Sequence, residues 1–210
     1  MKNAMRTIGK LCLFGLVMAA PALAQSRLHS DPSPAVAGPA YDLSVGYSHL
    51  TWAIPSAGRV NLNGLDFGGS VALGPRWGVM LDSGYLRTTS NVLNTPHQGY
   101  ALTFHAGPAF SVFDRGNTRV FVRGLAGAAL VDGAVPISDT DYFHGWLVRP
   151  SYAVGAGVEH SVAAHLAIRV NGDYLRTTFY DSSGAARPQN NFRLTTSFVF
   201  RLKERPHRSR

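Results

Sequence analysis

The 210-residue sequence has a single cysteine, Cys12, and only 15% of its residues are charged. One cysteine excludes an internal disulfide framework and a cysteine-based metal site. The low charge, with 45% hydrophobic residues, excludes an intrinsically disordered chain. No apolar run of about 18 residues follows Ala24, so the sequence predicts no transmembrane helix.

Glycine and aromatic residues are what the chain has instead. There are 22 glycines, and 10% of the residues are aromatic. Many glycines and aromatics with few charges indicate short strands rather than helices. The length fits a single domain.

The first 24 residues have the pattern of a secretory signal peptide. Lys2, Arg6 and Lys10 precede an apolar core, and the sequence Ala22-Leu23-Ala24 fits a signal-peptidase site. The apolar core is too short to span a bilayer of about 30 Å. We therefore expect an exported protein that is cleaved after Ala24.

Two further segments lie outside the expected domain at 40–202. Residues 25–39 are rich in Pro, Ser and Ala and predict a flexible leader. Residues 203–210 form a short basic tail. Loss of the three basic residues before Ala24 lowers the net charge from +8 to +5, and the remaining arginines are spread along the chain. The sequence therefore predicts no nucleic-acid partner.

From Tyr41 onward, apolar and polar residues alternate with a period of two, which is typical of strands with two unlike faces. Eight such runs lie near residues 41–48, 65–73, 77–85, 100–111, 119–130, 151–159, 166–174 and 192–201. In the fifth of these runs, Phe121 and Leu125 fall on the polar side.

The gaps between these runs alternate in length. Short gaps lie at 74–76, 114–117 and 161–164, and long ones at 54–62, 88–98, 132–147 and 180–190. An even number of strands with alternating short turns and long loops predicts an all-β fold, an eight-stranded antiparallel up-and-down transmembrane β-barrel. Both chain ends would then lie on the periplasmic, short-turn side. The sequence Tyr-Leu-Arg-Thr-Thr occurs twice before a long gap, at 85–89 and 174–178.

Three features predict that lipid lies outside the barrel. The polar face is rich in small residues, which suit a narrow lumen. Its charges balance, five acids (Asp42, Asp66, Asp82, Asp173, Glu159) against five arginines (Arg119, Arg123, Arg169, Arg193, Arg201), as an enclosed space requires. Aromatic residues end the apolar rows and predict two interfacial girdles, one on the turn side (Tyr41, Trp77, Phe110, Phe200) and one on the loop side (Trp52, Tyr85, Tyr100, Tyr152, Tyr174, Phe192).

With these features the chain resembles the small eight-stranded bacterial outer-membrane β-barrel family, which includes opacity-like proteins. The resemblance lies in the signal peptide and in the segments 104–111, 165–175 and 189–194, and it covers about residues 40–202. It implies a location in the outer membrane of a Gram-negative cell. Such barrels often end near a terminal aromatic residue, whereas here residues 203–210 continue past Phe200.

Candidate chemical motifs are sparse. Glu159-His160-Ser161 is expected on the periplasmic side, while Asp139, Asp141 and His144 are expected in the third long loop. We expect His105 to point into the lumen as a hydrogen-bonded structural residue. The glycine-rich stretches 64–69 and 124–127 lie inside strands, so they are not phosphate loops. The sequence therefore predicts no catalytic, cofactor-binding or metal-binding residues, and no cofactor.

The expected role is structural or interactive, through four outer loops and with a lumen plugged by ion pairs. The 132–147 segment, with Tyr142, Phe143 and Trp146, is the expected contact surface. Expected partners are outer-membrane lipid and lipopolysaccharide, the barrel-assembly machinery during insertion, and an extracellular ligand held by the loops. The alternatives are a lipid A-modifying enzyme and a narrow pore.

Overall fold

The computed structural model describes residues 40–54, 58–92, 95–136, 142–180 and 185–202. The expected signal peptide, the leader and the basic tail lie outside these ranges. Within them, no helix is long and apolar enough to cross a membrane. The strands are β1 (Tyr41–Ile54), β2 (Gly58–Ala72), β3 (Trp77–Val92), β4 (Thr95–Arg115), β5 (Thr118–Pro136), β6 (Tyr142–Ala163), β7 (Leu166–Tyr180) and β8 (Ala186–Arg201).

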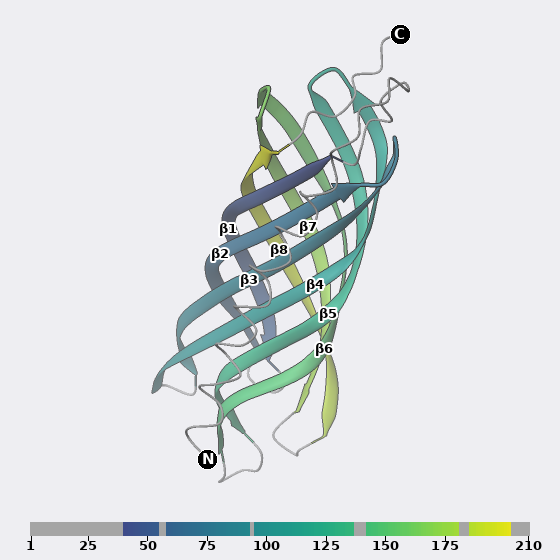
Figure 1. The fold of residues 1–210 in the computed structure, drawn as a ribbon. Coiled ribbons are helices and arrows are strands. Elements are labelled where there is room, and N and C mark those ends of the chain that lie inside the picture. Colours follow the sequence, from purple (N-terminus) through teal and green to yellow (C-terminus); the bar gives the residue numbers. More distant parts are fainter. Residues whose placement is uncertain (1–39, 55–57, 93–94, 137–141, 181–184, 203–210) are drawn as a thin grey trace, which may run out of the picture. The chain divides into compact units, whose positions relative to one another are not determined.

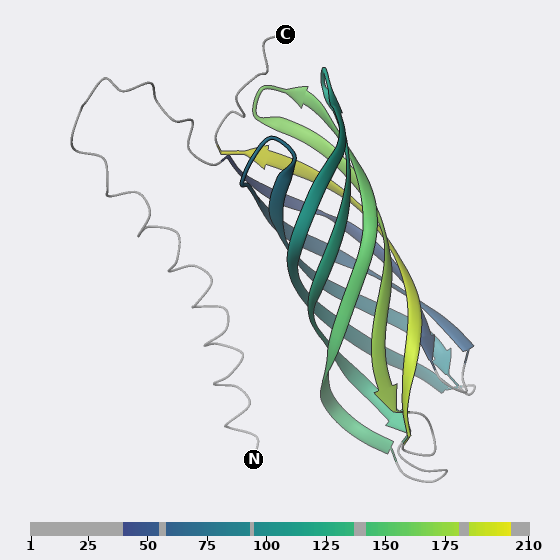
Figure 2. The ribbon, with the colours of Figure 1, turned by 90° about the vertical axis from the view of Figure 1, so that its right-hand side faces the viewer.

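Each strand pairs antiparallel with the next, and β1 also pairs with β8, so the sheet closes into a barrel. Figure 1 shows the strands inclined around the barrel, and Figure 2 shows the same ring from the side. This closure leaves no unpaired sheet edge, which is what a strand structure needs in hydrocarbon. The predicted fold class is confirmed.

The two faces of the sheet follow the predicted alternation. Leu81 is 55% exposed on the outside, whereas its neighbours Met80 and Asp82 are 2% and 4% exposed. Phe121 and Leu125, which fall on the polar side of their run, are buried inside as expected. The outer surface is therefore an apolar band that faces lipid, and the inner surface is a lumen of buried side chains.

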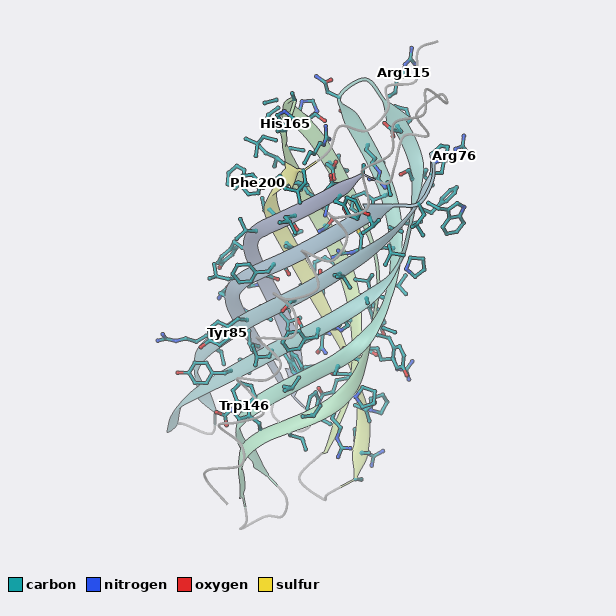
Figure 3. The ribbon with its side chains drawn as sticks, viewed as in Figure 1. Arg76, Tyr85, Arg115, Trp146, His165 and Phe200 are labelled. Carbon is teal, nitrogen blue, oxygen red and sulfur yellow. The ribbon has the colours of Figure 1, made fainter. Side chains whose placement is uncertain are left out.

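The short connections lie at one end of the barrel, called here the turn end. Figure 3 shows Arg76, Arg115 and His165 at this end, and Tyr85 and Trp146 toward the other. The β4–β5 and β6–β7 turns are tighter than expected, because β4 continues to Arg115 and β6 to Ala163. Gly116 has a φ of 60°, a left-handed conformation that glycine adopts without steric cost and that allows this tight turn.

The predicted long loops at the other end, called here the loop end, are wrong in extent. β2 already begins at Gly58, β3 continues to Val92, β4 begins at Thr95 and β8 begins at Ala186. In the third gap, β5 runs to Pro136 and β6 starts at Tyr142. The apolar alternation ends where the lipid ends, but strand pairing continues beyond it, because paired backbone groups need no apolar side chains outside the membrane.

Aromatic side chains mark both borders of the apolar band. At the turn end, the ring centroids of Trp77 and Phe110 lie 4.8 Å apart, and toward the loop end Tyr85 and Tyr100 are stacked at 6.1 Å. Trp52 is an exception to the predicted girdle. It is 5% exposed and points into the barrel, because the inward positions of β1 are the even-numbered ones and the strand continues to Ile54.

Because Leu81 faces the middle of the apolar band, Leu81→Arg is expected to lower the free energy of unfolding in lipid by about 2–4 kcal/mol. Urea titration of the barrel folded into vesicles measures this loss. Leu73→Arg is the matched control at the turn end, where an exposed leucine lies near the interface and the expected loss is about 0–1 kcal/mol. Equal losses at the two positions would contradict the placement of the lipid band.

Candidate functional site in the barrel lumen

The structure brings all ten predicted charged residues to the inner face of the barrel. Nine of them have at most 9% of their surface exposed, and the side chain of Arg201, at the turn end, is 17% exposed. Isolated charges are costly to bury, so such residues must be paired. Nine of the ten fall into a central cluster and a turn-end cluster, and Asp42 accepts a hydrogen bond from Ser70 Oγ at 3.0 Å.

Arg193 is the centre of the first cluster and is fully buried. Its Nη1 lies 2.6 Å from Asp82 Oδ1 and 3.9 Å from Asp66 Oδ2, and its Nη2 lies 3.0 Å from Asp173 Oδ2. One guanidinium from β8 therefore links carboxylates of β2, β3 and β7 across the lumen.

Arg123 of β5 completes the central cluster. Its Nε and Nη2 donate to the two oxygens of Asp173 at 2.9 and 2.6 Å, a bidentate geometry, and its Nη2 lies 3.3 Å from Asp82 Oδ2. Gly155 faces this pair, and a Cβ added there would collide with Asp173. A glycine at this position lets the carboxylate lie close against β6.

His105 lies in the lumen, as predicted, and is 4% exposed. Its Nε2 is 2.9 Å from Ser151 Oγ, and its Nδ1 is 3.9 Å from Asp82 Oδ1. The imidazole thus connects β4 and β6 to the same carboxylate that Arg193 and Arg123 contact. The central cluster draws its side chains from every strand except β1.

The turn-end cluster is built around Glu159 of β6. Arg169 donates to Glu159 Oε2 from Nη2 at 2.7 Å and from Nε at 3.0 Å. Arg201 donates from Nη2 to Glu159 Oε1 at 3.0 Å and to Ser161 Oγ at 2.7 Å. The register pairs Glu159 directly with Arg169 on the neighbouring strand, whereas Arg201 reaches Glu159 from β8, two strands away.

Phe121 lies against two arginines at the turn end of the lumen. Its ring is fully buried, with the guanidinium carbon of Arg119 5.5 Å and that of Arg169 5.7 Å from the ring centroid. Arg119 Nε also donates to Ser111 Oγ at 2.6 Å. Cations over the face of an aromatic ring are attracted by its quadrupole. The cation–π contacts with Arg119 and Arg169 thus stabilise the Phe121 ring inside a charged lumen.

The loop end of the lumen is apolar, which the alternation of the sequence did not predict. Trp52 and Phe179 pack with centroids 5.4 Å apart, and Trp52 Nε1 donates to Gln189 Oε1 at 2.8 Å. Leucines and a valine on the inner face continue this layer: Leu50, Val60, Leu62, Leu86 and Leu175. The charged clusters therefore lie on the turn-end side of an apolar layer.

The candidate triad Glu159-His160-Ser161 does not assemble. Glu159 and Ser161 contact Arg201 in the lumen, whereas His160 is exposed on the outer face and its Nδ1 is 3.0 Å from Thr118 Oγ1. Consecutive strand residues point to opposite faces, so three in a row cannot converge.

The remaining candidates are the residues of the third long loop and the glycine-rich stretches. Asp139 and Asp141 lie outside the described residues, and so does the side chain of His144, whose backbone lies in β6 rather than in a loop. The glycine-rich stretches 64–69 and 124–127 lie within β2 and β5, as expected. His49, which no sequence pattern singled out, lies on the outer face with its Nδ1 2.7 Å from Asn63 Oδ1. Among the described residues, no group of three or more His, Cys, Asp or Glu side chains could hold a metal ion.

The pairing of Glu159 with Arg169 is testable by a double-mutant cycle. Glu159→Leu removes the carboxylate that Arg169 contacts, and Arg169→Leu removes the guanidinium at Glu159 Oε2 while Arg201 still contacts Oε1. The double variant is therefore expected to recover about 1–3 kcal/mol relative to the summed losses. Unfolding in vesicles measures each variant. In the control cycle, Arg123→Leu replaces Arg169→Leu, and its effect is expected to add to that of Glu159→Leu within about 0.5 kcal/mol. Additive losses for Glu159 and Arg169 would contradict the pair.

The comparisons with known proteins agree with this geometry. The family described as "Outer membrane protein beta-barrel domain" matches residues 11–200. The chain belongs to this family. Its place is therefore the cell outer membrane, as the sequence predicted. No curated protein matches the chain.

Solved structures of similar fold are small outer-membrane barrels. Neisserial surface protein A has a TM-score of 0.61 at 8% identity, covering 78% of this chain and 98% of that one. Ail, the attachment invasion locus protein of Yersinia pestis, has a TM-score of 0.55 at 16% identity, covering 79% of this chain and 99% of that one. A second structure of Ail, in complex with the heparin analogue sucrose octasulfate, scores 0.53. At these identities the likeness shows the fold alone.

Proposed function

We propose that this protein is a structural and interaction barrel of the outer membrane, with a plugged lumen and with its loop end presented to the cell exterior. The central cluster carries the proposal, because Arg193 and Arg123 join carboxylates from β2, β3 and β7 at distances of 2.6–3.9 Å. An eight-stranded barrel is just wide enough for its side chains to fill. Charges that pair across such a lumen leave little room for a solute.

The apolar layer supports the plug independently. An ion that entered from the loop end would have to pass Leu50, Leu86 and Leu175, which are fully buried, before reaching the first charged cluster. Desolvating an ion in such a layer is costly. This arrangement favours a closed barrel over the alternative of a narrow pore.

The same pairing argues against catalysis. The polar groups that could serve as acid, base or nucleophile inside the barrel contact one another: Glu159 contacts Arg169, His105 contacts Ser151, and Asp173 contacts Arg123. They also lie within the lumen, away from any substrate in the outer leaflet. A non-enzymatic role is therefore part of the proposal, and the contacts it needs lie on the outside of the barrel.

The partners in this proposal are the assembly machinery during insertion, outer-membrane lipid, and an extracellular ligand at the loop end. The orientation follows from the chain ends. β1 begins at Tyr41 and β8 ends at Arg201, both at the turn end, and in bacterial barrels the short turns face the periplasm.

Cysteine labelling of whole cells tests the orientation, because the only natural cysteine, Cys12, lies in the expected signal peptide. Arg59→Cys, at the exposed start of β2, is expected to react with a membrane-impermeant maleimide. Arg76→Cys and Arg115→Cys, at the turn end, are expected to react only after the outer membrane is permeabilised. Labelling of the turn-end cysteines in intact cells, with Arg59→Cys protected, would show that the barrel is inserted the other way.

A further inference from the structure

The repeated sequence Tyr-Leu-Arg-Thr-Thr takes the same position in β3 and β7. Tyr85 and Tyr174 point outward and are 44% and 49% exposed, while the next residues, Leu86 and Leu175, are fully buried in the lumen. β3 and β7 lie on opposite sides of the ring. The repeat therefore builds two similar surfaces at the loop-end border of the lipid band.

The arginine of each repeat comes next on the outer face. Arg87 and Arg176 are exposed, one outward step beyond the girdle tyrosine. In the strand register, Arg87 lies between Asn63 of β2 and Tyr100 of β4. Each arginine thus has a tyrosine preceding it on its own strand.

The neighbours of the second arginine have the same chemistry. Arg176 lies between Asn190 of β8 and Tyr152 of β6. Each arginine is therefore flanked by an asparagine on one side and by a tyrosine on the other. Tyr152 is 58% exposed, so this ring is open to whatever lies against the barrel.

These two arginines lack the acidic partners that the lumen arginines have. Among the described residues, no ion pair involves Arg87 or Arg176, whereas Arg123, Arg169 and Arg193 each form at least one. The register places Asp132 of β5 beyond Tyr100, so a whole strand separates this carboxylate from Arg87. Both arginines therefore present an unmatched positive charge at the depth of the lipid headgroups.

We propose that each surface, Arg87 with Tyr85, Tyr100 and Asn63, and Arg176 with Tyr174, Tyr152 and Asn190, binds the phosphate of a phosphorylated glycolipid of the outer leaflet. The guanidinium binds the phosphate with a fork of N–H donors. Tyrosine rings pack at the headgroup level, where an apolar body and a polar tip are both satisfied. The asparagine amides contact sugar hydroxyls. Two lipids bind per barrel, on opposite sides. This inference rests on the orientation in the proposed function.

The experiment measures the binding of bisphosphorylated lipid A to the full barrel in detergent, by native mass spectrometry over a range of lipid concentrations. The wild type is expected to bind two lipids. Arg87→Gln and Arg176→Gln are each expected to weaken one site by at least about fivefold, and the double variant to weaken both. Arg59→Gln, exposed near the start of β2 and beyond the headgroups, is the matched control and is expected to bind as the wild type does.

Three further arms decide the ligand and the site. Dephosphorylated lipid A is expected to bind the wild type as weakly as bisphosphorylated lipid A binds the double variant. Equal affinity of the wild type for the dephosphorylated and bisphosphorylated forms would overturn the proposal. Inorganic phosphate is expected not to displace the lipid, and displacement at equal concentration would assign the sites to a free ion instead. Wild-type affinity in the double variant would also overturn the inference.

The orientation has its own control. Loss of binding in Arg76→Gln, at the turn end, with binding retained in the double variant, would mean that the turn end faces the outer leaflet. That result would overturn both the inference and the proposed orientation. If the wild type binds no lipid A while the cysteine variants label as expected, the inference is overturned and the proposed orientation stands.

Discussion

Arg193→Leu is expected to lower the free energy of unfolding by about 3–5 kcal/mol, because it removes a guanidinium that faces the carboxylates of Asp66, Asp82 and Asp173 and leaves Arg123 as the arginine in contact with Asp82 and Asp173. Arg193 is fully buried, so water cannot readily replace it. Urea or guanidinium titration of the barrel in vesicles, followed by tryptophan fluorescence, measures the loss.

Two variants separate charge from volume in this prediction. Arg193→Lys keeps the charge but not the fork of donors that reaches Asp82 and Asp173 together, and it is expected to lose less than Arg193→Leu. Arg59→Leu, on the exposed outer face, is expected to change stability by at most about 0.5 kcal/mol. A loss for Arg193→Leu no larger than that for Arg59→Leu would show that the central cluster does not stabilise the barrel.

Phe121→Ala is the other large expected effect, a loss of about 3–5 kcal/mol. The guanidinium carbons of Arg119 and Arg169 lie 5.5 and 5.7 Å from the ring centroid, and the ring's Cζ is one of the atoms that a Cβ at Gly157 would meet, at 2.5 Å. Its removal leaves a cavity and takes the aromatic face from two guanidiniums. The same vesicle titration measures this variant.

Phe121→Leu is the control, because it keeps most of the volume and removes the aromatic ring. It is expected to cost clearly less than Phe121→Ala, with the remaining loss due to the cation–aromatic contacts. If alanine and leucine at 121 have the same small effect, the site is loosely packed and water fills it, which would contradict a dry turn-end cluster.

The sequence predicts the faces of the sheet well, because side-chain direction in a strand has a period of two and an error of one residue would expose every lumen charge. It therefore identifies Asp82, His105 and Arg193 as inward and Leu81 as outward, all confirmed. Phe121 is placed inward despite its apolar character, because its neighbours on the strand fix the register.

The loop end is where prediction from the sequence fails. Beyond the apolar band, outward positions such as Arg87 and Thr51 are polar, so the alternation that marks a strand disappears while the strand pairing continues. Trp52 was assigned to the girdle for this reason. The apolar layer at Leu50 and Leu86 was not predicted, because these residues come after the end of the alternating runs. Within those runs the inner face consists mainly of small and polar residues.

Contacts across the lumen could not be predicted from the sequence either. Which inward residues meet depends on how far the strands are staggered when the ring closes. Arg123 of β5 reaches Asp173 of β7, and Arg193 of β8 reaches Asp82 of β3, although neither pair lies on neighbouring strands. The sequence predicts five acids balanced by five arginines, but only the structure shows which of them contact one another and that nine of the ten form two clusters.

The most direct test of the plugged lumen is the conductance of the purified wild-type barrel in planar lipid bilayers. The ion-pair clusters and the apolar layer at the loop end predict no steady current larger than that of the bare bilayer. A difference in gel migration between unboiled and boiled protein shows that the barrel used is folded. A steady, reproducible conductance step for each inserted molecule would contradict the plug and support a pore.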